Sequence, residues 1–182
     1  MEEIPRLPKT EPLQLRYYGD PVLRKRAEPV QEITDVERLL ADDMLETLYT
    51  SFGIGLAATQ VGILKRFIIA DIGVVDDEEE FEPLKLFNPE IISVEGECVL
   101  EEGCLSIPDL RAEVKRPEQI VVNAMNIDGE DVQIEADGLL ARVIQHEIDH
   151  LNGVLFIDRI SGIKRQLLRD QLKIIQQAER PD

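Results

Sequence analysis

The sequence predicts an α+β fold in a single domain, in which mostly antiparallel sheets pack around a central helix, with a further helix near each terminus. Strand-like segments gather between residues 66 and 136, and helical patterns precede and follow them. The strands therefore do not alternate with helices as βαβ units would require. A chain of 182 residues with 43% apolar residues is the size of one ordinary domain and can bury a core.

The N-terminal part is expected to contain a lead-in and then a helix. The first 14 residues are rich in acidic residues and proline, and we expect them to be poorly ordered. A capping box marks the start of the helix, because Thr34 is followed three residues later by Glu37. Apolar side chains then recur at helical spacing, at Val36, Leu39, Leu40, Met44 and Leu48. The helix should end near residues 51–53.

Segments typical of strands fill the middle of the chain, where Pro, Asn-Pro and Asp-Gly turns separate them. They are RFIIADIG (66–73), LKLFNPEIISVEGECVL (84–100), AEVKRP (112–117) and QIVVNAMNIDGEDVQIEA (119–136). The clearest turn is Asp128-Gly129, which predicts a β-hairpin.

Two further helices are predicted after the strands. Asp137 should cap the first, GLLARVIQHEIDHLNG (138–153), and Asn152-Gly153 should close it. The C-terminal helix runs from about residue 161 to residue 180. Its apolar residues available for packing are Ile163, Leu167, Ile174 and Ala178.

Composition excludes several classes of function. The formal net charge of −17 argues against a protein that binds DNA, or nucleic acid in general, because such binding needs clustered Lys and Arg. No segment reaches the roughly 20 apolar residues of a membrane span, and the N-terminal residues do not follow the pattern of a signal peptide. We therefore expect a cytoplasmic protein without membrane contact. Two cysteines are too few for a disulfide framework, so both are expected to be thiols.

The predicted central helix holds both histidines of the chain, in the segment QHEIDH (145–150). At about 100° per residue, His146 and His150 face the same side one turn apart, and Glu147 lies on the flank of that side. Two imidazoles can then bind one metal ion while the carboxylate overhangs it. The other faces are largely apolar, so the helix should be buried, and a metal would offset the cost of burying its polar groups.

A buried helix with hydrogen-bonded histidines is the alternative, and the third ligand decides between these interpretations. Two metalloprotease patterns are incomplete, because Phe156 stands where one needs a histidine and the only downstream glutamate is Glu179, on an expected surface helix. A donor must then come from upstream. Cys104 in EEGCLSIP (101–108) offers a thiolate in an extended segment, although a small buried hydrophobe is its ordinary role, which Cys98 keeps.

Three stretches together resemble the signature motifs of the peptide deformylase family, in the same order and at similar separations. They are GIGLAATQ (53–60), EEGCLS (101–106) and QHEIDH (145–150). The resemblance extends more diffusely from about Tyr18 to Leu167. It implies a metal-dependent hydrolase that removes the formyl group from the N-terminal formyl-methionine of newly synthesised polypeptides. Its partners would be formyl-methionyl nascent peptides.

Two other functions remain open at this point. One is a metallo-amidase or peptidase on the same scaffold with a different acyl preference. The other is a structural metal site in a protein without activity. Glu147 and Gln60 argue against the second, because a structural site needs neither a base nor a hydrogen-bond donor to an oxyanion.

The resemblance implies that Cys104, His146 and His150 hold one divalent metal ion, and that Glu147 is the general acid and base. It implies Fe(II) as the physiological ion, with Ni(II) or Zn(II) as substitutes, although a set of two histidines and one cysteine also suits zinc. Three protein ligands would leave a fourth position for water, whose pKa the metal brings toward neutrality.

The resemblance also assigns the oxyanion donors and the substrate-binding residues. Gln60 and the backbone amide of Leu105 would stabilise the oxyanion. The residues that would bind substrate are Ile54, Gly55, Gly103, Arg111, Leu139 and Arg142. In the family, the position of Arg142 lines the pocket for the methionine side chain, and we expect its stem to wall that pocket while its charged end reaches water. Glu102 and Arg116 resemble a pair that supports the cysteine strand, but both could equally be solvated surface charges.

The C-terminal segment is basic in an otherwise acidic chain. Residues 159–182 contain six basic and three acidic residues. Arg165, Arg169 and Lys173 recur at four-residue spacing and so form one basic stripe on the predicted helix. Some members of the family are thought to dock on the ribosome through this helix, which implies a weak ribosome contact here. A solvated surface is the alternative.

Overall fold

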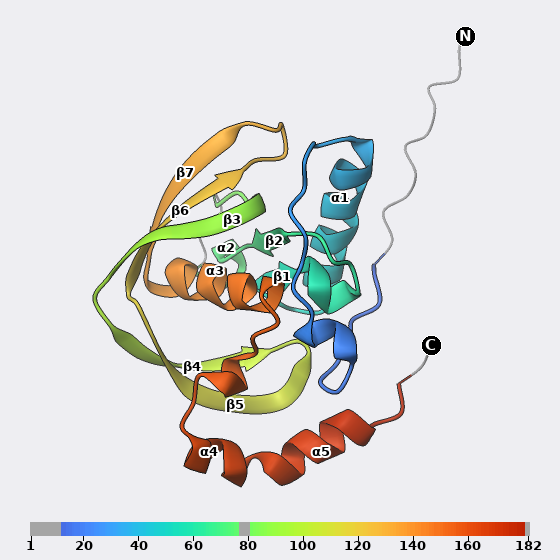
Figure 1. Cartoon of the computed structure of the whole chain (residues 1–182), viewed down its shortest axis with the longest axis vertical. Coiled ribbons are helices and arrows are strands. Elements are labelled where there is room, and N and C mark those ends of the chain that lie inside the picture. The colour runs from blue at the N-terminus through green and yellow to red at the C-terminus, as the bar shows by residue number, and fades with distance from the viewer. Residues whose placement is uncertain (1–11, 77–80, 181–182) are drawn as a thin grey trace.

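The computed structural model describes residues 12–76 and 81–180, and it contains two antiparallel sheets with a helix between them (Figure 1). Most of the expected lead-in lies outside the described residues. Where the described chain begins, the Leu13 amide donates a hydrogen bond to Thr47 Oγ1 at 2.7 Å. Within the described ranges, no helix combines the length and the apolar character that crossing a membrane requires.

The larger sheet has five strands in the order β1-β2-β3-β6-β7, and each strand is antiparallel to its neighbours. The strands are β1 (Gly55–Ala57), β2 (Phe67–Ala70), β3 (Leu84–Glu95), β6 (Gln119–Met125) and β7 (Asp131–Asp137). β1 ends the described sheet, so one of its edges carries no strand of this sheet. The predicted hairpin at Asp128-Gly129 is confirmed: it joins β6 to β7, and Gly129 has the left-handed φ of 82° that glycine adopts without strain.

The smaller sheet pairs β4 (Cys98–Cys104) with β5 (Ile107–Arg116). The two strands connect through Leu105 and Ser106, and Cys104 pairs with Ile107 at this end. The thiol of Cys104, the predicted third metal ligand, therefore lies where this hairpin turns.

The first helix, α1 (Asp35–Thr50), begins at the predicted capping box. The Thr34 amide donates to Glu37 Oε2 at 3.0 Å, and Lys65 Nζ donates to Glu37 Oε1 at 2.5 Å. Four shorter helical segments are η1 (Pro21–Arg24), η2 (Ala58–Val61), α2 (Gly73–Asp76) and η3 (Phe156–Asp158). The capping box anchors α1 beside the strands, because its carboxylate also holds Lys65 near the start of β2.

The central helix, α3 (Gly138–Leu151), runs between the two sheets, and residues 141–151 are all buried (Figure 1). Its predicted closure is confirmed, since Gly153 has a φ of 72°. The predicted cap is wrong in one respect: Asp137 precedes the helix but makes no capping hydrogen bond with its side chain. Gly138, the first residue of α3, has a φ of 52°, which lies outside the right-handed helical range.

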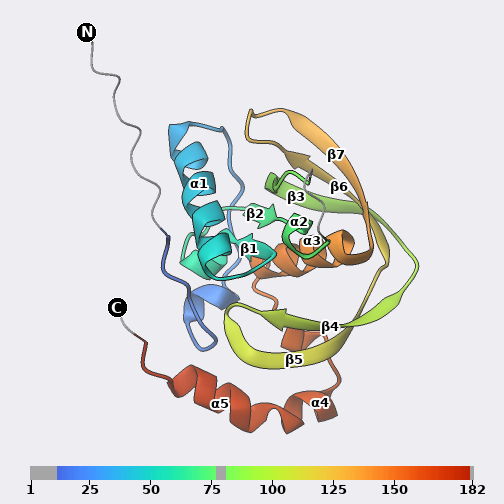
Figure 2. The ribbon, with the colours of Figure 1, turned by 180° about the vertical axis from the view of Figure 1, so that it is seen from behind.

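The C-terminal segment forms two helices instead of one, α4 (Gly162–Leu167) and α5 (Arg169–Gln177), which lie against the outer side of β5 in both views (Figure 2). The ψ of −5° at Leu168 separates them. The expected packing residues are also wrong, because Ile163, Leu167, Ile174 and Ala178 are exposed. The buried residue is Leu172, which packs in the cluster beneath β5, and this contact turns the other side of the helices toward solvent.

Candidate active site

The end of β4 and one side of α3 bring three potential metal ligands together. The Nε2 atoms of His146 and His150 are 3.2 Å apart, and Cys104 Sγ lies 3.3 Å from His150 Nε2. All three candidate donor atoms lie within 4.8 Å of one another. The cluster found among the described residues does not include Cys98, which lies at the other end of β4. The geometry therefore favours Cys104 as the third donor.

This arrangement fits a single tetrahedral cation. With metal–nitrogen distances of about 2.05 Å and a metal–sulfur distance of about 2.3 Å, a tetrahedron separates two nitrogens by roughly 3.3 Å and a nitrogen from a sulfur by roughly 3.6 Å. The observed separations of 3.2 and 3.3 Å are close to these. Hydrogen bonds alone do not satisfy the site, because Glu147 Oε2 is buried without a partner among the described residues.

Glu147 lies beside the cluster, and only 3% of the residue is exposed. Burial raises the pKa of its carboxyl group to about 7. Gly55 provides the space for this side chain, because a Cβ at position 55 would lie 2.5 Å from Glu147 Oε1. A carboxyl group that titrates near neutrality can both accept and return a proton at the pH of the cell.

Gln60 is fixed at both ends of its amide group. Its Oε1 accepts a hydrogen bond from the Ala57 amide at 2.9 Å, and its Nε2 donates to Ser106 Oγ at 3.2 Å. The same nitrogen lies 3.6 Å from Cys104 Sγ. Leu105 follows Cys104 directly and lines the same cavity. The Gln60 side chain thus presents an N–H donor beside the cluster.

A second buried carboxylate, that of Glu102, accepts four hydrogen bonds. Its Oε2 accepts from His146 Nδ1 at 2.9 Å and from Arg116 Nη2 at 3.0 Å, and its Oε1 accepts from Arg116 Nε and from Arg142 Nη1. Burial would raise the pKa of Glu102, but the bonds from His146 and Arg116 outweigh burial and hold that pKa below its usual value. Arg116 also donates to Asp149 Oδ2 at 2.9 Å. The Glu102–Arg116 pair is therefore a buried support, not two solvated charges.

Arg142 lines the cavity, but the prediction that its charged end reaches water is wrong. Only 5% of the residue is exposed, and its guanidinium donates to Glu102 Oε1 at 2.7 Å. It also donates to the backbone carbonyls of Cys98 and Val114, at 2.8 and 2.9 Å. The buried charge of Glu102 explains this orientation, because a buried carboxylate is stable only when cations and donors compensate it.

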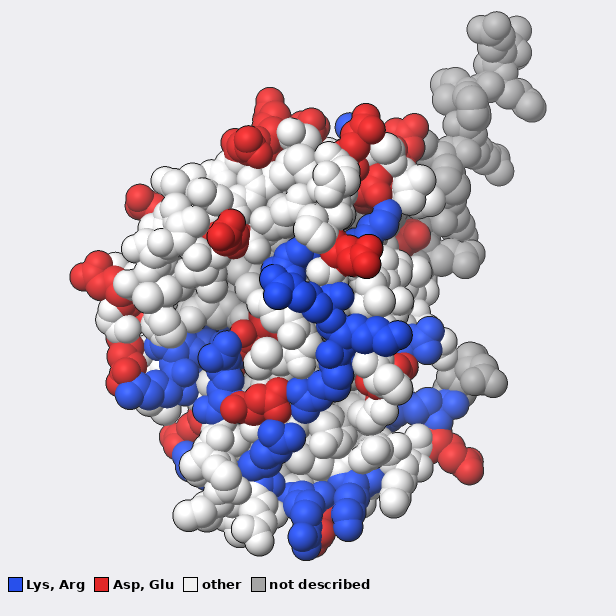
Figure 3. All heavy atoms as spheres, viewed as in Figure 1, with Lys and Arg blue, Asp and Glu red and all other residues white. Residues whose placement is uncertain are grey.

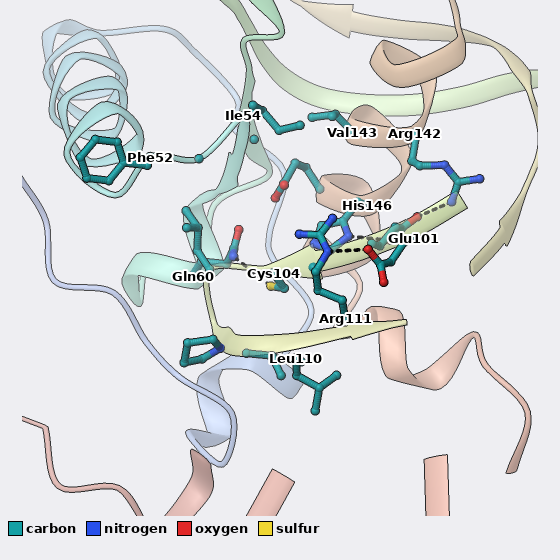
Figure 4. Close-up of a pocket in the computed structure, with 18 of the residues that line it drawn as sticks. Phe52, Ile54, Gln60, Glu101, Cys104, Leu110, Arg111, Arg142, Val143 and His146 are labelled. Atoms are coloured by element: carbon teal, nitrogen blue, oxygen red, sulfur yellow. Dashed lines mark hydrogen bonds and ion pairs between the residues drawn. The ribbon is translucent and has the colours of Figure 1, made fainter. Parts of the chain in front are cut away.

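A cavity of about 570 Å³ adjoins these groups (Figure 4). Its lining includes every predicted site residue except His150, namely Ile54, Gly55, Gln60, Gly103, Cys104, Leu105, Arg111, Leu139, Arg142, His146 and Glu147. At its rim, Arg111 Nε donates to Glu101 Oε2 at 2.9 Å. Arg111 also approaches Gly103, where a Cβ would lie 3.0 Å from its Nη1. The three sequence motifs therefore meet at one cavity.

Comparison with known proteins agrees with this geometry. The family model described as polypeptide deformylase matches residues 12–166. The chain belongs to the polypeptide deformylase family. A peptide deformylase of Thermodesulfovibrio yellowstonii is 47% identical to it over 161 residues, which cover 88% of this chain and 96% of the relative. A peptide deformylase of Rhizobium meliloti is 53% identical over 150 residues, which cover 82% of this chain and 85% of the relative.

Solved deformylase structures share the fold. The crystal structure of a peptide deformylase from Legionella pneumophila matches with a TM-score of 0.84 at 40% sequence identity, over 93% of this chain and 99% of that one. The peptide deformylase from Synechococcus elongatus, solved in complex with actinonin, matches with a TM-score of 0.81 at 45% identity, over 93% and 88%. The predicted α+β fold with mostly antiparallel sheets around a central helix is confirmed.

As a member of the deformylase family, the protein is a hydrolase that removes N-formyl groups from newly synthesised peptides. The predictions of family, enzyme class and reaction are confirmed, and the alternative of an amidase with another acyl preference is not favoured. The deformylases are metalloenzymes, and Cys104, His146 and His150 form a metal-binding group here.

Several residues at the deformylase site were not singled out from the sequence, and three of them are notable for their contacts or position. Ser106 holds Gln60, Asp149 accepts hydrogen bonds from Arg116 and Arg159, and Phe52 lines the cavity. Ser106 and Asp149 lie inside two of the three motifs, so their position was a usable signal. Phe52 directly precedes the first motif, and nothing in its sequence context marks it.

Proposed function

We propose that this chain hydrolyses the formyl amide of N-terminal formyl-methionine at the cluster of Cys104, His146 and His150. The observation that carries the proposal is the convergence of three donor atoms within 4.8 Å at a cavity that Glu147 also lines. The three residues would hold one divalent cation. When bound, that cation would supply Lewis-acid activation of water and of the formyl oxygen.

The proton transfers are assigned to Glu147. Its carboxylate takes a proton from the attacking water as a C–O bond forms at the formyl carbon. It returns the proton to the amine nitrogen as the C–N bond breaks, which releases formate and a free N-terminal amino group. Gln60 Nε2 and the backbone amide of Leu105 donate hydrogen bonds to the oxygen that gains negative charge. The bonds from Ala57 and Ser106 hold the Gln60 amide in one orientation for this role.

We assign the residues that line the cavity to binding of the substrate peptide. Ile54 and Gly55 bind its backbone at the free edge of β1, with Gly103 opposite. Leu139 and the aliphatic stem of Arg142 line the pocket for the methionine side chain. Arg111 contacts the peptide at the rim. The guanidinium of Arg142 does not contact the substrate in this assignment; it donates a hydrogen bond to Glu102 instead.

The test is turnover by metal-loaded protein of a formyl-methionyl peptide against its acetyl analogue. The formyl peptide should release formate, and the acetyl peptide should remain intact. Comparable turnover of both peptides would contradict a deformylase and support a broader amidase.

We propose Fe(II) as the physiological ion on the ground of membership in the deformylase family, since two imidazoles and one thiolate would also suit zinc. The thiolate must stay reduced in order to ligate a metal, which supports a cytoplasmic location. Zn(II) and Ni(II) should substitute in vitro.

Air should inactivate the iron-loaded protein faster than the zinc-loaded protein. Oxygen oxidises ferrous iron, the Cys104 thiolate, or both, whereas Zn(II) has no accessible redox chemistry. The measurement is the half-life of activity in air for protein purified anaerobically and loaded with each metal. Equal half-lives would rule out Fe(II) as the oxidation-sensitive component.

We further propose a weak ribosome contact through α4 and α5. Arg165, Arg169 and Lys173 border one surface depression despite the break at Leu168, and Figure 3 shows basic atoms over this end of the molecule. Arg165 is partly neutralised, because it donates to Asp158 at 2.8 Å. Such a stripe would bind ribosomal RNA in a salt-dependent way.

Replacing the three stripe residues by glutamate should abolish co-sedimentation with ribosomes at low salt while free formyl peptide is still hydrolysed, because the stripe lies outside the cavity. A matched control reverses three other exposed cations, Lys25, Arg38 and Lys115, and changes the net charge equally. If wild type and stripe variant co-sediment equally, or if both variants lose binding, the stripe is not a specific contact.

A further inference from the structure

Phe52 is the most exposed of the large apolar side chains described, with 94% of its surface open to solvent. It also has a φ of 57°, in the left-handed region where glycine is usual and a bulky side chain is strained. The left-handed backbone costs free energy on folding, and the exposed ring contributes no packing that would offset this cost. A contact between the ring and a ligand would explain why this conformation is retained.

The backbone holds Phe52 in a fixed position at the end of α1. Its amide donates to the Tyr49 carbonyl at 3.2 Å, and the next amide, that of Gly53, donates to the Leu48 carbonyl at 3.0 Å. Gly53 is wedged between two side chains, since a Cβ there would lie 2.8 Å from Leu105 Cδ1 and 2.9 Å from Leu48 Cδ1. The ring is therefore presented from a packed segment, and little entropy would be lost when a ligand contacts it.

Phe52 also lies on the path that a bound peptide would take. It lines the same cavity as the metal-binding cluster, on the side of Ile54, across from His146 and Arg142 (Figure 4). Gly55 abuts Glu147, and Phe52 lies three residues before Gly55. A peptide whose formyl group is at Glu147 and which pairs antiparallel with residues 53–55 advances about 3.3 Å per residue toward Phe52. Its second or third residue would reach the ring.

We propose that Phe52 is a specificity-determining residue, whose ring contacts an apolar side chain at the second or third position of the formylated peptide. This inference rests on the proposed function and extends it beyond the methionine pocket. The ring offers apolar area without a charge or hydrogen-bonding group, so leucine should gain from the contact and serine should not.

The test compares four formylated tripeptides on the metal-loaded enzyme, with serine or leucine at the second and third positions after formyl-methionine. In the wild type, kcat/KM should be about fivefold higher for leucine than for serine at the contacted position. In Phe52→Ser this ratio should fall to near unity, because kcat/KM should fall more for the peptide with leucine at the contacted position than for the all-serine peptide. Val36→Ser removes another exposed apolar side chain, outside the cavity, and should keep the wild-type ratio.

Phe52→Gly distinguishes loss of the contact between ring and peptide from loss of stability. Glycine adopts this φ without strain, so Tm should rise by roughly 2–4 °C while the leucine preference is lost. An unchanged leucine-to-serine ratio in Phe52→Ser overturns the inference. If this variant keeps the ratio but loses self-association, the ring is a contact between copies of the chain, and the inference is also overturned. Failure of the wild type to hydrolyse any of the four peptides would instead refute the proposed function.

Discussion

Glu147→Gln should lower deformylation by roughly 10²-fold to 10⁴-fold while the protein keeps its metal. The amide fills the space that Gly55 leaves for the carboxylate, so the cavity is preserved, but an amide cannot accept and return a proton. The three donor atoms of the cluster belong to other residues, and metal content should therefore stay near one ion per chain. The measurements are kcat/KM on a formyl-methionyl peptide and metal analysis of the same sample.

A matched control is Glu135→Gln, which makes the same chemical change at an exposed position of β7. It should leave both rate and metal content unchanged. Near-normal turnover by Glu147→Gln would remove the acid–base role from this residue. Loss of metal from Glu147→Gln would instead make the carboxylate a ligand.

Glu102→Gln should weaken metal binding by about 10-fold to 100-fold, because Glu102 orients the His146 ring. Only the oxygen of the new amide can accept hydrogen bonds, so its nitrogen would face donors of His146, Arg116 or Arg142. Two buried guanidinium groups would also lose their shared carboxylate. We expect a loss of about 3–5 kcal/mol in the free energy of unfolding, as for other broken buried ion pairs.

The neighbouring residue of β4 provides the control. Glu101 pairs with Arg111 at 2.9 Å, but the side chains of both residues are 60% exposed. Glu101→Gln should therefore change the free energy of unfolding by less than about 1 kcal/mol and leave metal affinity intact. A metal competition titration and denaturant unfolding of both variants measure these effects. If the two variants behave alike, Glu102 does not position His146.

Local chemistry explains which features could be predicted from the sequence. The capping box at Thr34, the Asp128-Gly129 hairpin and the spacing of His146 and His150 depend on residues within a few positions of one another, and the structure contains all three. The resemblance to the family motifs then identified Cys104 as the third residue of this site. What these patterns could not predict was decided by partners distant in sequence.

Arg142 shows this limit most clearly. Its partner Glu102 lies 40 residues earlier, so the sequence could place the stem on the cavity side of α3 but could not predict that the guanidinium turns inward. The same holds for α5, where packing of Leu172 beneath β5 decides which side of the helix is buried. Phe52 was missed because sequence patterns do not register an exposed side chain on a left-handed backbone.

The division of the donor atoms between two layers gives the cation a mechanical role. Cys104 belongs to the two-stranded sheet, whereas His146 and His150 belong to the helix. A bound ion would therefore cross-link the sheet to the helix, and its binding free energy would add to the stability of the folded chain. The cavity lies along this seam, since both layers contribute to its walls. Loss of the ion would loosen the framework that shapes the cleft, so chemical competence and the rigidity of the binding groove would disappear together.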